Sequence, residues 1–430
     1  MSRQKLTRLL LGGALGVAAL ACSAPVPASA APACQPTQAA GTTCQYTYTN
    51  PSGTRVYRVH VPAGYISSGA SRPLLMELHG CNSDNAVAEE RWSRFSELSD
   101  RYGFMVAYPQ QDLNANNSDC WNWFLPQNET RNPGQPAVPD TGEPSMIAGI
   151  TRTVMSKWNV DARRVYVGGI SAGGGMSAVM AATYPDIFAA AMVYAGCEYM
   201  GETCTSGPAA LPPQVSGQLA YQAGGQYART VPVITIHGTA DEVVPYANSA
   251  LVVQSFLHMD SYAVNGGTDT APVLTLPDKS TTATSPGGQL YLVQDYHDPA
   301  GCLLAQQWSV NGMLHAWSAG GSNGSATDMV FTDPAGPDVS TPIYQFFMSH
   351  PMPPAGNHGC YQPAAAGPAS AATAAASSHG RTGPTAATGS GLPLTGASRP
   401  LPAGPILTIV IMAGVILAAA SAARTSRRFN

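Results

Sequence analysis

The middle of the chain alternates between short apolar runs and longer stretches with a helical pattern. Four apolar runs end in turn residues, as buried parallel strands do, and they lie at 74–78, 104–108, 165–167 and 233–236. The stretch 54–61 alternates between apolar and polar residues and predicts an early edge strand. Helical stretches fall between the runs, at roughly 86–102, 144–158, 172–183 and 246–259. This alternation predicts the α/β class, with a mainly parallel sheet covered by helices on both faces.

Composition agrees with a folded, exported protein. The chain has 430 residues, of which 44% are hydrophobic and 11% are charged, and this excludes a wholly disordered chain. Residues 31–362 contain no internal repeat and no low-complexity break, so we assign them to a single catalytic domain. In parallel sheets of this class, reactive groups gather at the carboxyl ends of the strands.

The net charge of −4 hides two basic ends and an acidic middle. Three basic residues and no acid occur in residues 1–30, and four basic residues and no acid occur in residues 397–430. The remaining chain therefore carries −11, without a basic run. Such a balance argues against nucleic acid and anionic surfaces as partners.

Residues 1–30 have the order of a secretory signal peptide. A charged segment is followed by the apolar stretch Leu9–Leu20 and by Ala28-Ser29-Ala30, which has the small-x-small pattern of a cleavage site. A lipoprotein signal ending at Cys22 is the alternative, but Leu20 is one place too close to Cys22 for the usual pattern. We expect cleavage after Ala30.

The C-terminal part has three sections in a fixed order. Residues 363–391 are rich in Ala, Ser, Thr, Gly and Pro and are too poor in large apolar groups to fold, so they predict a linker. Residues 392–396 read Leu-Pro-Leu-Thr-Gly, and residues 397–430 contain an apolar run that is closed by arginines. Taken alone, the run predicts a C-terminal transmembrane helix as a membrane anchor.

The order of these three sections resembles the sortase cell-wall sorting signal of Gram-positive bacteria. The resemblance implies cleavage between Thr395 and Gly396, removal of residues 397–430 and covalent attachment of Thr395 to the wall. Sortase and cell-wall peptidoglycan are the partners that it implies.

The cysteines fit an oxidising compartment. Without Cys22, eight remain, an even number that predicts four disulfides, although eight cysteines allow 105 connectivities. Short loops favour two pairs and leave two others, which gives Cys34–Cys44, Cys197–Cys204, Cys81–Cys120 and Cys302–Cys360. A zinc site is the alternative, but no C-x-x-C or H-x-x-x-H spacing occurs, so we expect neither a metal nor a cofactor.

A candidate catalytic motif follows the apolar run at 165–167. Gly169-Ile170-Ser171-Ala172-Gly173 has the pattern G-x-S-x-G between a predicted strand and a predicted helix. Flanking glycines leave room for a strained turn that lifts a serine above the sheet. Ser171 is therefore the predicted nucleophile, and the N–H of Ala172 at the start of the helix is a predicted oxyanion donor.

A serine nucleophile needs a base that is held by an acid. In an α/β-hydrolase the chain order is nucleophile, acid, base. Asp241 follows the strand run at 233–236 and is the predicted acid, and His315 in a glycine-rich loop is the predicted base. The weaker candidates are Glu242, Asp295 and Asp298 for the acid, and His297, His258, His350, His358 and His379 for the base.

The second oxyanion donor is expected in the loop after the run at 74–78. Gly80 allows the backbone to turn an N–H inward, so the N–H of Cys81 is the predicted donor. His79 is expected to order this loop or to contact the substrate. Cys81 as a nucleophile is the alternative, but the serine turn already supplies one.

Together these motifs resemble the esterase family of extracellular polyhydroxybutyrate depolymerases and the related feruloyl and acetylxylan esterases. The likeness runs over about residues 45–350, and the stretches that carry it are 78–81, 120–124, 169–173, 237–241 and 312–317. It implies an α/β-hydrolase fold, the triad Ser171, Asp241 and His315, and an oxyanion amide at Cys81. The chain departs from the family pattern at 125–140 and 297–310, where added segments are expected to shape the substrate cleft.

The combined prediction is a wall-anchored serine carboxylester hydrolase that resembles polyhydroxybutyrate depolymerases and acts through an acyl-enzyme. Its substrate is expected to be a polyester, or alternatively an acylated polysaccharide cleaved by a feruloyl or acetylxylan esterase. A serine peptidase and a catalytically inactive surface-binding protein are the other readings. Trp121, Trp123 and Trp317 either line an apolar substrate cleft or pack in the core.

Overall fold

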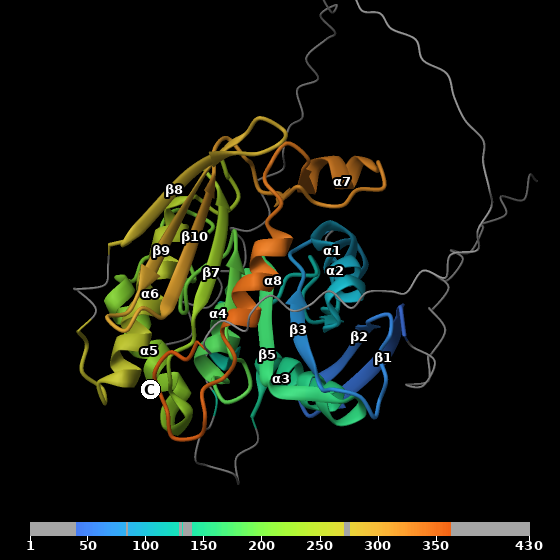
Figure 1. The fold of residues 1–430 in the computed structure, drawn as a ribbon, viewed down its shortest axis with the longest axis horizontal. Helices are drawn as coiled ribbons and strands as arrows, with labels where there is room; N and C mark the ends of the chain where they lie inside the picture. Colours follow the sequence, from blue (N-terminus) through green and yellow to red (C-terminus); the bar gives the residue numbers. More distant parts are fainter. Residues whose placement is uncertain (1–39, 83–84, 129–130, 132–139, 271–275, 363–430) are drawn as a thin grey trace, which may run out of the picture. The chain divides into compact units, whose positions relative to one another are not determined.

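The computed structural model describes residues 40–82, 85–128, 131, 140–270 and 276–362 (Figure 1). The predicted signal peptide, linker, sorting motif and apolar tail lie outside these residues, and so do Cys34 and His379. Within the described part, no helix is both long enough and apolar enough to cross a bilayer.

The described residues form a ten-stranded sheet in the order β1-β2-β4-β3-β5-β6-β7-β10-β9-β8. Its six central strands, from β4 to β10, run parallel, and both margins are antiparallel. The strands are β1 (Thr42–Asn50), β2 (Gly53–Val61), β3 (Arg72–Leu78), β4 (Met105–Pro109), β5 (Val160–Ile170), β6 (Ala191–Tyr194), β7 (Val233–Gly238), β8 (Lys279–Thr284), β9 (Leu290–His297) and β10 (Leu303–Val310). A mainly parallel sheet was predicted, and the centre of the sheet has this form.

Two expectations about strands are wrong. The stretch 54–61 is β2, but it is not an edge strand, because β1 pairs with it as an antiparallel hairpin and occupies the edge. The segment 297–310 is not an inserted cleft segment. Most of it is β10, which pairs in parallel with β7 and so belongs to the centre of the sheet.

The helices agree with the predicted stretches except at one break. The stretch 86–102 is two helices, because Arg94 between them takes a left-handed conformation with φ 57°. The helices are α1 (Ala86–Ser93), α2 (Phe95–Tyr102), α3 (Gly142–Lys157), α4 (Ala172–Thr183), α5 (Pro213–Gly224), α6 (Ala247–Val264), α7 (Ala326–Phe331) and α8 (Ser340–Ser349). The sequence pattern did not predict α5, α7 or α8.

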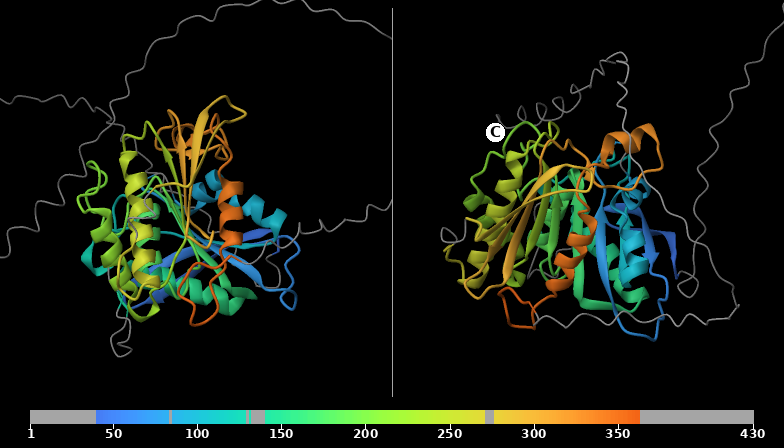
Figure 2. Two further views of the ribbon diagram at one scale, coloured as in Figure 1. Left: turned by 60° about the vertical axis from the view of Figure 1, so that its left-hand side comes forward. Right: turned by 45° about the horizontal axis from the view of Figure 1, so that its top comes forward.

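Each face of the sheet has its own apolar core. Side chains alternate between faces along a strand, so Leu74, Met76 and Leu78 of β3 join one core and Leu75 joins the other. The first core packs against α3, α4, α5 and α6, and the second packs against α1, α2 and α8. The left-hand view of Figure 2 shows α6 in yellow and α8 in orange on opposite sides of the sheet.

Three disulfides join described cysteines, and they are the pairs expected from the sequence, namely Cys81–Cys120, Cys197–Cys204 and Cys302–Cys360. Cys44 is also disulfide-bonded, and its expected partner lies outside the described residues. The stretch 125–140 is described only in part. There η2 (Pro126–Asn128) is a 3₁₀ turn, and the Arg131 guanidinium lies over the rings of Tyr184 and Tyr227.

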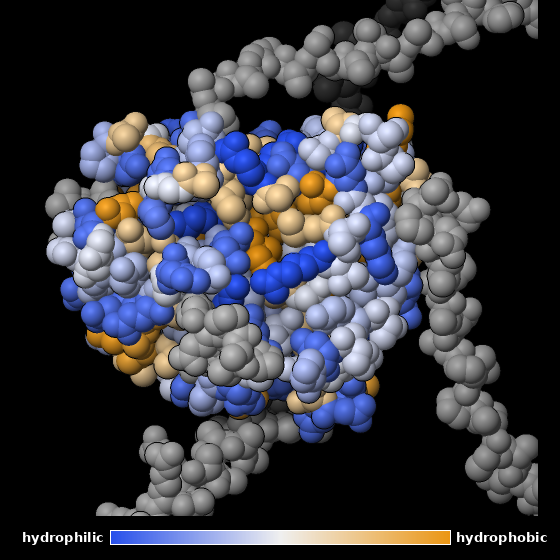
Figure 3. Space-filling model, turned by 90° about the horizontal axis from the view of Figure 1, so that it is seen from below, coloured by the Kyte–Doolittle hydropathy of each residue, from blue (hydrophilic) through white to orange (hydrophobic). Residues whose placement is uncertain are grey.

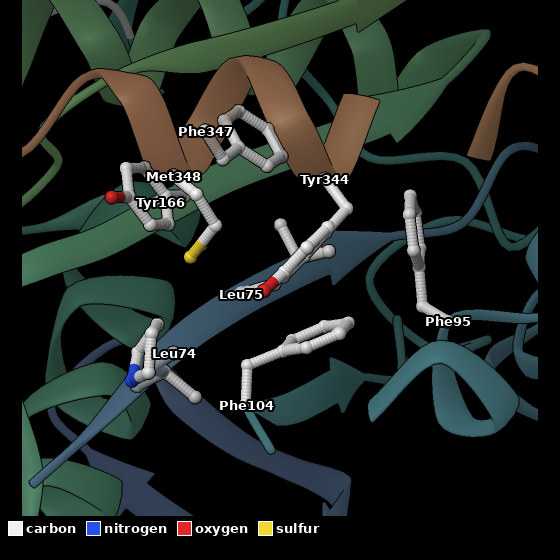
Figure 4. Close-up of a pocket in the computed structure, with 9 residues that line it drawn as sticks. Leu74, Leu75, Phe95, Phe104, Tyr166, Tyr344, Phe347 and Met348 are labelled. Carbon is white, nitrogen blue, oxygen red and sulfur yellow. The ribbon is translucent and has the colours of Figure 1, made fainter. Parts of the chain in front are cut away.

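The molecule seen from below the view of Figure 1 is mostly hydrophilic, with apolar residues near the centre of that face and in a patch at its lower left margin (Figure 3). A narrow apolar hollow without room for a water molecule lies between α8 and the first half of β3, and Leu74, Tyr166 and Phe347 are among its lining residues (Figure 4). In parallel sheets of this class, reactive groups gather at the carboxyl ends of the strands, whereas the hollow lies beside the first half of β3. This hollow is therefore not at the edge where the predicted catalytic residues lie.

Candidate active site

Ser171 lies in a strained turn between β5 and α4. Its backbone has φ 58° and ψ −122°, a combination that non-glycine residues rarely adopt. Its N–H donates to the carbonyl of Tyr194 at 2.9 Å. A Cβ atom on Gly173 would lie 1.9 Å from the carbonyl oxygen of Leu78, and one on Gly169 would lie 2.3 Å from the same oxygen. Only glycine fits at these two positions, and the turn packs directly against the end of β3.

Asp241 and His315 are in direct contact, although 74 residues separate them. Asp241 follows β7 and His315 follows β10, and these two strands are parallel neighbours. The His315 Nδ1–H donates to Asp241 Oδ2 at 2.7 Å, and the aspartate side chain is fully buried. The other carboxylate oxygen, Oδ1, accepts from the N–H groups of Val243 and Val244, each at 2.9 Å.

A second histidine also faces this carboxylate. His237 Nε2 lies 3.3 Å from Asp241 Oδ2 and 2.8 Å from the carbonyl of Val244. Burial raises the pKa of Asp241, but the hydrogen bonds from His237 and His315 outweigh burial and hold the pKa below its ordinary value. The aspartate is therefore ionised at neutral pH and can orient His315. Sequence reasoning assigned no role to His237, although it opens the quoted stretch 237–241.

The loop that carries His315 rests on the end of β7. The Ala240 N–H donates to the carbonyl of Met313 at 3.1 Å, and the Gly312 N–H donates to Thr239 Oγ1 at 2.8 Å. Only β6 separates β7 from β5 in the sheet. The three predicted triad residues therefore follow strands that end at one edge of the sheet.

The predicted oxyanion donors lie beside the serine turn. Ala172 is the first residue of α4, where backbone N–H groups have no acceptor within the helix. The carbonyls of Leu78 and His79 lie next to Gly173, so the loop leading to Cys81 contacts the turn. The Cys81–Cys120 disulfide ties this loop to the segment before Trp121.

His79 orders this loop and does not reach the surface. Its side chain is fully buried, Nδ1–H donates to the carbonyl of Gly80 at 2.9 Å, and Nε2 accepts from the N–H of Gln111 at 3.0 Å. Burial lowers the pKa of His79 to about 4, so the ring is neutral at neutral pH. A direct substrate contact, one of the two roles expected, does not fit a side chain with both nitrogens bonded to backbone.

A buried polar network contacts the segment that the disulfide ties to the loop of Cys81. The sequence pattern did not predict it. Glu143, at the start of α3, accepts from Gln111 Nε2 and from Asn122 Nδ2, each at 2.6 Å, and its other oxygen accepts from the Asn122 N–H at 2.7 Å. Gln111 also donates to the carbonyl of Cys120 at 2.9 Å. Because Glu143 lies 32 residues from Gln111 and 21 residues from Asn122 in the chain, their relation is visible only in the fold.

The three tryptophans belong to the core. Trp121 and Trp317 have no exposed surface and Trp123 is 8% exposed, so of the two roles expected for these residues, core packing fits the structure and cleft lining does not. Trp317 stacks on Tyr194 with ring centres 4.6 Å apart, and its Nε1–H donates to Ser340 at 3.1 Å. Two exposed apolar residues are close in the chain to the predicted acid and base, namely Leu314, next to His315, and Val243, two residues after Asp241.

The alternative acids and bases within the described part have other surroundings. Glu242 is exposed, Asp295 accepts from Gln306, and Asp298 accepts from backbone N–H groups of its own turn. The remaining histidines contact groups away from Ser171, namely His297 with Asp278, His258 with Asp269, His350 with Phe346 and His358 with Ala228. In the residues that the structure describes, no group of three or more His, Cys, Asp or Glu is arranged to hold a metal ion.

Comparison with known proteins identifies the family. The model of the family described as "Esterase PHB depolymerase" matches residues 56–273, about half of the chain. The chain belongs to this family.

Among curated relatives, poly(3-hydroxyalkanoate) depolymerase C of Paucimonas lemoignei is 35% identical over 275 residues, which cover 62% of this chain and 59% of that protein. The probable acetylxylan esterase A of Aspergillus fumigatus is 34% identical over 206 residues, covering 45% of this chain and 51% of that protein. Feruloyl esterase B of Neurospora crassa is 34% identical over 164 residues, covering 38% and 50%. The chain thus spans between half and three fifths of the length of these relatives.

Among solved structures, the acetyl xylan esterase from Aspergillus awamori matches with a TM-score of 0.52 and 24% identity, covering 64% of this chain and 94% of that one. This likeness concerns the fold alone. Together with the parallel sheet, the helices on both faces and the strand–turn–helix at Ser171, it establishes the α/β-hydrolase fold that was predicted.

Proposed function

We propose that the chain is a serine carboxylester hydrolase that acts through an acyl-enzyme. Ser171 is the nucleophile, His315 is the general base and acid, and Asp241 orients the histidine. The observation that carries the proposal is the buried contact between His315 Nδ1 and Asp241 Oδ2, at 2.7 Å, on the same sheet edge as the strained serine turn. Membership of an esterase family supports it.

In the proposed acylation step, Ser171 Oγ attacks the carbonyl carbon of the ester while its proton passes to His315 Nε2. The negative charge that develops on the carbonyl oxygen is held by the N–H groups of Cys81 and Ala172. His315 is then an imidazolium, which the ionised Asp241 stabilises. It gives its proton to the leaving alkoxide, and the acyl group remains on Ser171.

Deacylation repeats these roles with water as the nucleophile. His315 takes a proton from water, the hydroxide attacks the acyl carbon, and the proton returns to Ser171 Oγ as the carboxylic acid leaves. No step needs a cofactor, because the proton moves between two side chains and the charge is met by backbone dipoles.

For the substrate we propose a polyester of the polyhydroxybutyrate type. The relative from Paucimonas lemoignei is a poly(3-hydroxyalkanoate) depolymerase, and its similarity covers more of this chain than that of the other relatives described above. Exposed Leu314 and Val243 suit an apolar chain near the catalytic residues. The second candidate is an acetylated or feruloylated polysaccharide, which the acetylxylan and feruloyl esterase relatives favour.

Activity measurements on the purified protein and on Ser171→Ala test the proposal. The panel contains short p-nitrophenyl esters, polyhydroxybutyrate film, methyl ferulate, acetylated xylan and a peptide amide. We expect ester hydrolysis by the wild type and a loss of about 10⁴- to 10⁶-fold in Ser171→Ala, with an unchanged fold by circular dichroism. A variant that keeps a tenth of the activity, or a wild type that cleaves only the amide, contradicts it.

We further propose that the enzyme is exported and anchored to the cell wall through Thr395. Paired cysteines in the folded part support an oxidising compartment. Thr395→Ala is expected to move the protein from the wall into the membrane or the medium. Cell fractionation after wall digestion, with mass spectrometry of the released C-terminus, measures this. A mature protein that still carries Gly396 and the apolar tail would favour the membrane anchor.

A further inference from the structure

We propose that Tyr194 is a positioning residue that sets the loop of His315 relative to the serine turn. This inference rests on the proposed function, since it concerns the same three catalytic residues. Tyr194 is the last residue of β6, the strand that lies between β5 and β7 in the sheet. It therefore stands between the strand that ends at Ser171 and the strand that leads to Asp241.

The backbone of Tyr194 holds the nucleophile turn. Its carbonyl oxygen accepts from the N–H of Ser171 at 2.9 Å, which extends the parallel pairing of β5 with β6 one residue beyond Ile170. Ser171 has an unfavourable positive φ, and a strained residue keeps its conformation only where its surroundings hold it. This hydrogen bond is one of the contacts that hold it.

The side chain of Tyr194 holds the histidine loop. Its hydroxyl donates to the carbonyl of Ala316 at 3.0 Å and accepts from the N–H of Ser318 at 2.7 Å. Its ring stacks on Trp317 at 4.6 Å between centres, with 22° between the planes. All three residues directly after His315 thus contact a single side chain.

These contacts are shielded from solvent, which makes them strong restraints on the position of the histidine loop. Tyr194, Trp317 and Ser318 are fully buried, so no solvent competes for the phenol. Burial raises the pKa of Tyr194 well above its ordinary value, so the hydroxyl keeps its proton and donates it to Ala316. Loss of the hydroxyl would leave a carbonyl and an N–H unpaired next to His315, and the loop would shift to satisfy them.

The consequence for catalysis is geometric. The proton must travel between Ser171 Oγ and His315 Nε2, and a displacement of about 1 Å at such a pair costs on the order of 10²-fold in rate. Tyr194 contacts the serine turn through its backbone carbonyl and the histidine loop through its side chain, so it can fix the distance between Ser171 and His315. Asp241 sets the direction of the imidazole ring, and Tyr194 sets the distance of its loop from the serine.

Tyr194→Phe tests the proposal, with Tyr166→Phe as the matched control. Tyr166 is a fully buried tyrosine of the adjacent strand β5, it stacks on Phe347 at 4.8 Å, and its hydroxyl has no hydrogen-bond partner among the described residues (Figure 4). Both substitutions remove one buried hydroxyl. They differ in whether that hydroxyl contacts the loop of His315.

The measurements are kcat and KM on a soluble p-nitrophenyl ester, normalised to active sites titrated with a fluorophosphonate, together with the downfield proton resonance of His315 Nδ1–H. We expect kcat of Tyr194→Phe to fall by about 10- to 100-fold with KM changed less than about threefold. We also expect its downfield resonance to move or broaden. Tyr166→Phe should keep kcat within about twofold and keep the resonance.

Normalisation to titrated sites separates turnover from the folded fraction, so a loss of protein does not count as a loss of kcat. Equal kcat values for Tyr194→Phe and wild type overturn the proposal, and so does a Tyr194→Phe protein that fails to fold while Tyr166→Phe folds. In either case the proposed function stands, because it depends on Ser171→Ala. An inactive wild type would instead contradict the proposed function itself.

Discussion

The serine turn and the histidine loop both follow strands that end at one edge of the sheet, but hydrogen bonds contribute more of the contacts that hold the loop. The turn at 169–173 joins a strand directly to a helix, and backbone atoms of the end of β3 press against its glycines. The loop at 311–318 has one such close fit, at Gly238 of β7, where a Cβ atom would lie 2.1 Å from the carbonyl oxygen of Met313. Hydrogen bonds from β6 and from the residues after β7, including the hydroxyls of Tyr194 and Thr239, hold it in place.

This difference predicts how each region responds to substitution. A turn that depends on close backbone contact fails when any atom is added, whatever the side chain. A loop that depends on separate hydrogen bonds is displaced a little further each time one of these bonds is removed. We therefore expect the serine turn to tolerate substitution less well than the part of the histidine loop that lies away from Gly238.

The strongest test of the site as a unit is a double-mutant comparison of Asp241→Asn and His315→Ala. Each single variant should lose about 10⁴-fold or more in kcat, and the double variant should lose little beyond either one, because the triad acts together. Ester hydrolysis by the three purified variants measures this. Additive losses would place one of the two residues outside the triad and make His297 and Asp295 the next residues to test.

The backbone contrast is tested by Gly173→Ala against Gly312→Ala. An alanine Cβ at 173 would lie 1.9 Å from a backbone oxygen, so we expect a protein that is inactive or does not fold. At 312 a Cβ meets open space and only the left-handed backbone, φ 74°, is strained, at about 1–2 kcal/mol. Expression, thermal unfolding and esterase activity of both variants measure the contrast. Similar losses in the two would remove the distinction between turn and loop.

Glu198, in the segment after β6, is a buried carboxyl group whose ionisation lowers the stability of the fold. Burial raises the pKa of Glu198 to about 8 from an ordinary value of 4.5, so the folded protein binds a proton there that the unfolded chain releases. The stability linked to this group is complete below about pH 4.5 and is lost as pH rises through 8. Glu198→Gln should therefore melt higher than wild type at pH 9, on the order of 5 °C, and similarly at pH 4.5.

Thermal unfolding at pH 4.5 and at pH 9 checks the Glu198 prediction. Glu202→Gln is the control, since Glu202 is an exposed carboxylate four residues further along the same loop. The two variants should differ at pH 9. A wild-type Tm that is as insensitive to alkaline pH as that of Glu198→Gln would contradict the raised pKa.

The smallest expected effect concerns one bond of the histidine loop. Thr239→Val removes the hydroxyl that accepts from the Gly312 N–H at 2.8 Å but keeps the shape of the side chain. Because Thr239 is exposed, the bond contributes about 0.5–1.5 kcal/mol, and kcat should fall less than tenfold. Kinetics on a soluble ester measure this. A loss as large as that of His315→Ala would mean that the loop is as intolerant as the serine turn.

Prediction from sequence succeeded where a few consecutive residues carry the information. The helix at 172–183 and the turn before it agree with the structure residue for residue, because glycine, strand and helix follow one another in the chain. It failed for β10, whose interior Gln306 and Gln307 break the apolar pattern. Those amides are bonded to Asp295 and Ser249, and this satisfies them inside the sheet. Arg94 likewise splits a predicted helix without any glycine or proline to mark the break.

The sequence by itself determined which residues follow the ends of strands, and hence the candidates Ser171, Asp241 and His315, because turns and strands depend on neighbouring residues. Only the tertiary structure decided that Asp241 and His315 touch, that Tyr194 contacts both the serine turn and the histidine loop, and that the tryptophans are core residues. These contacts depend on the order of strands across the sheet. That order minimises the free energy of the whole packed domain, and no local segment of the chain contains it.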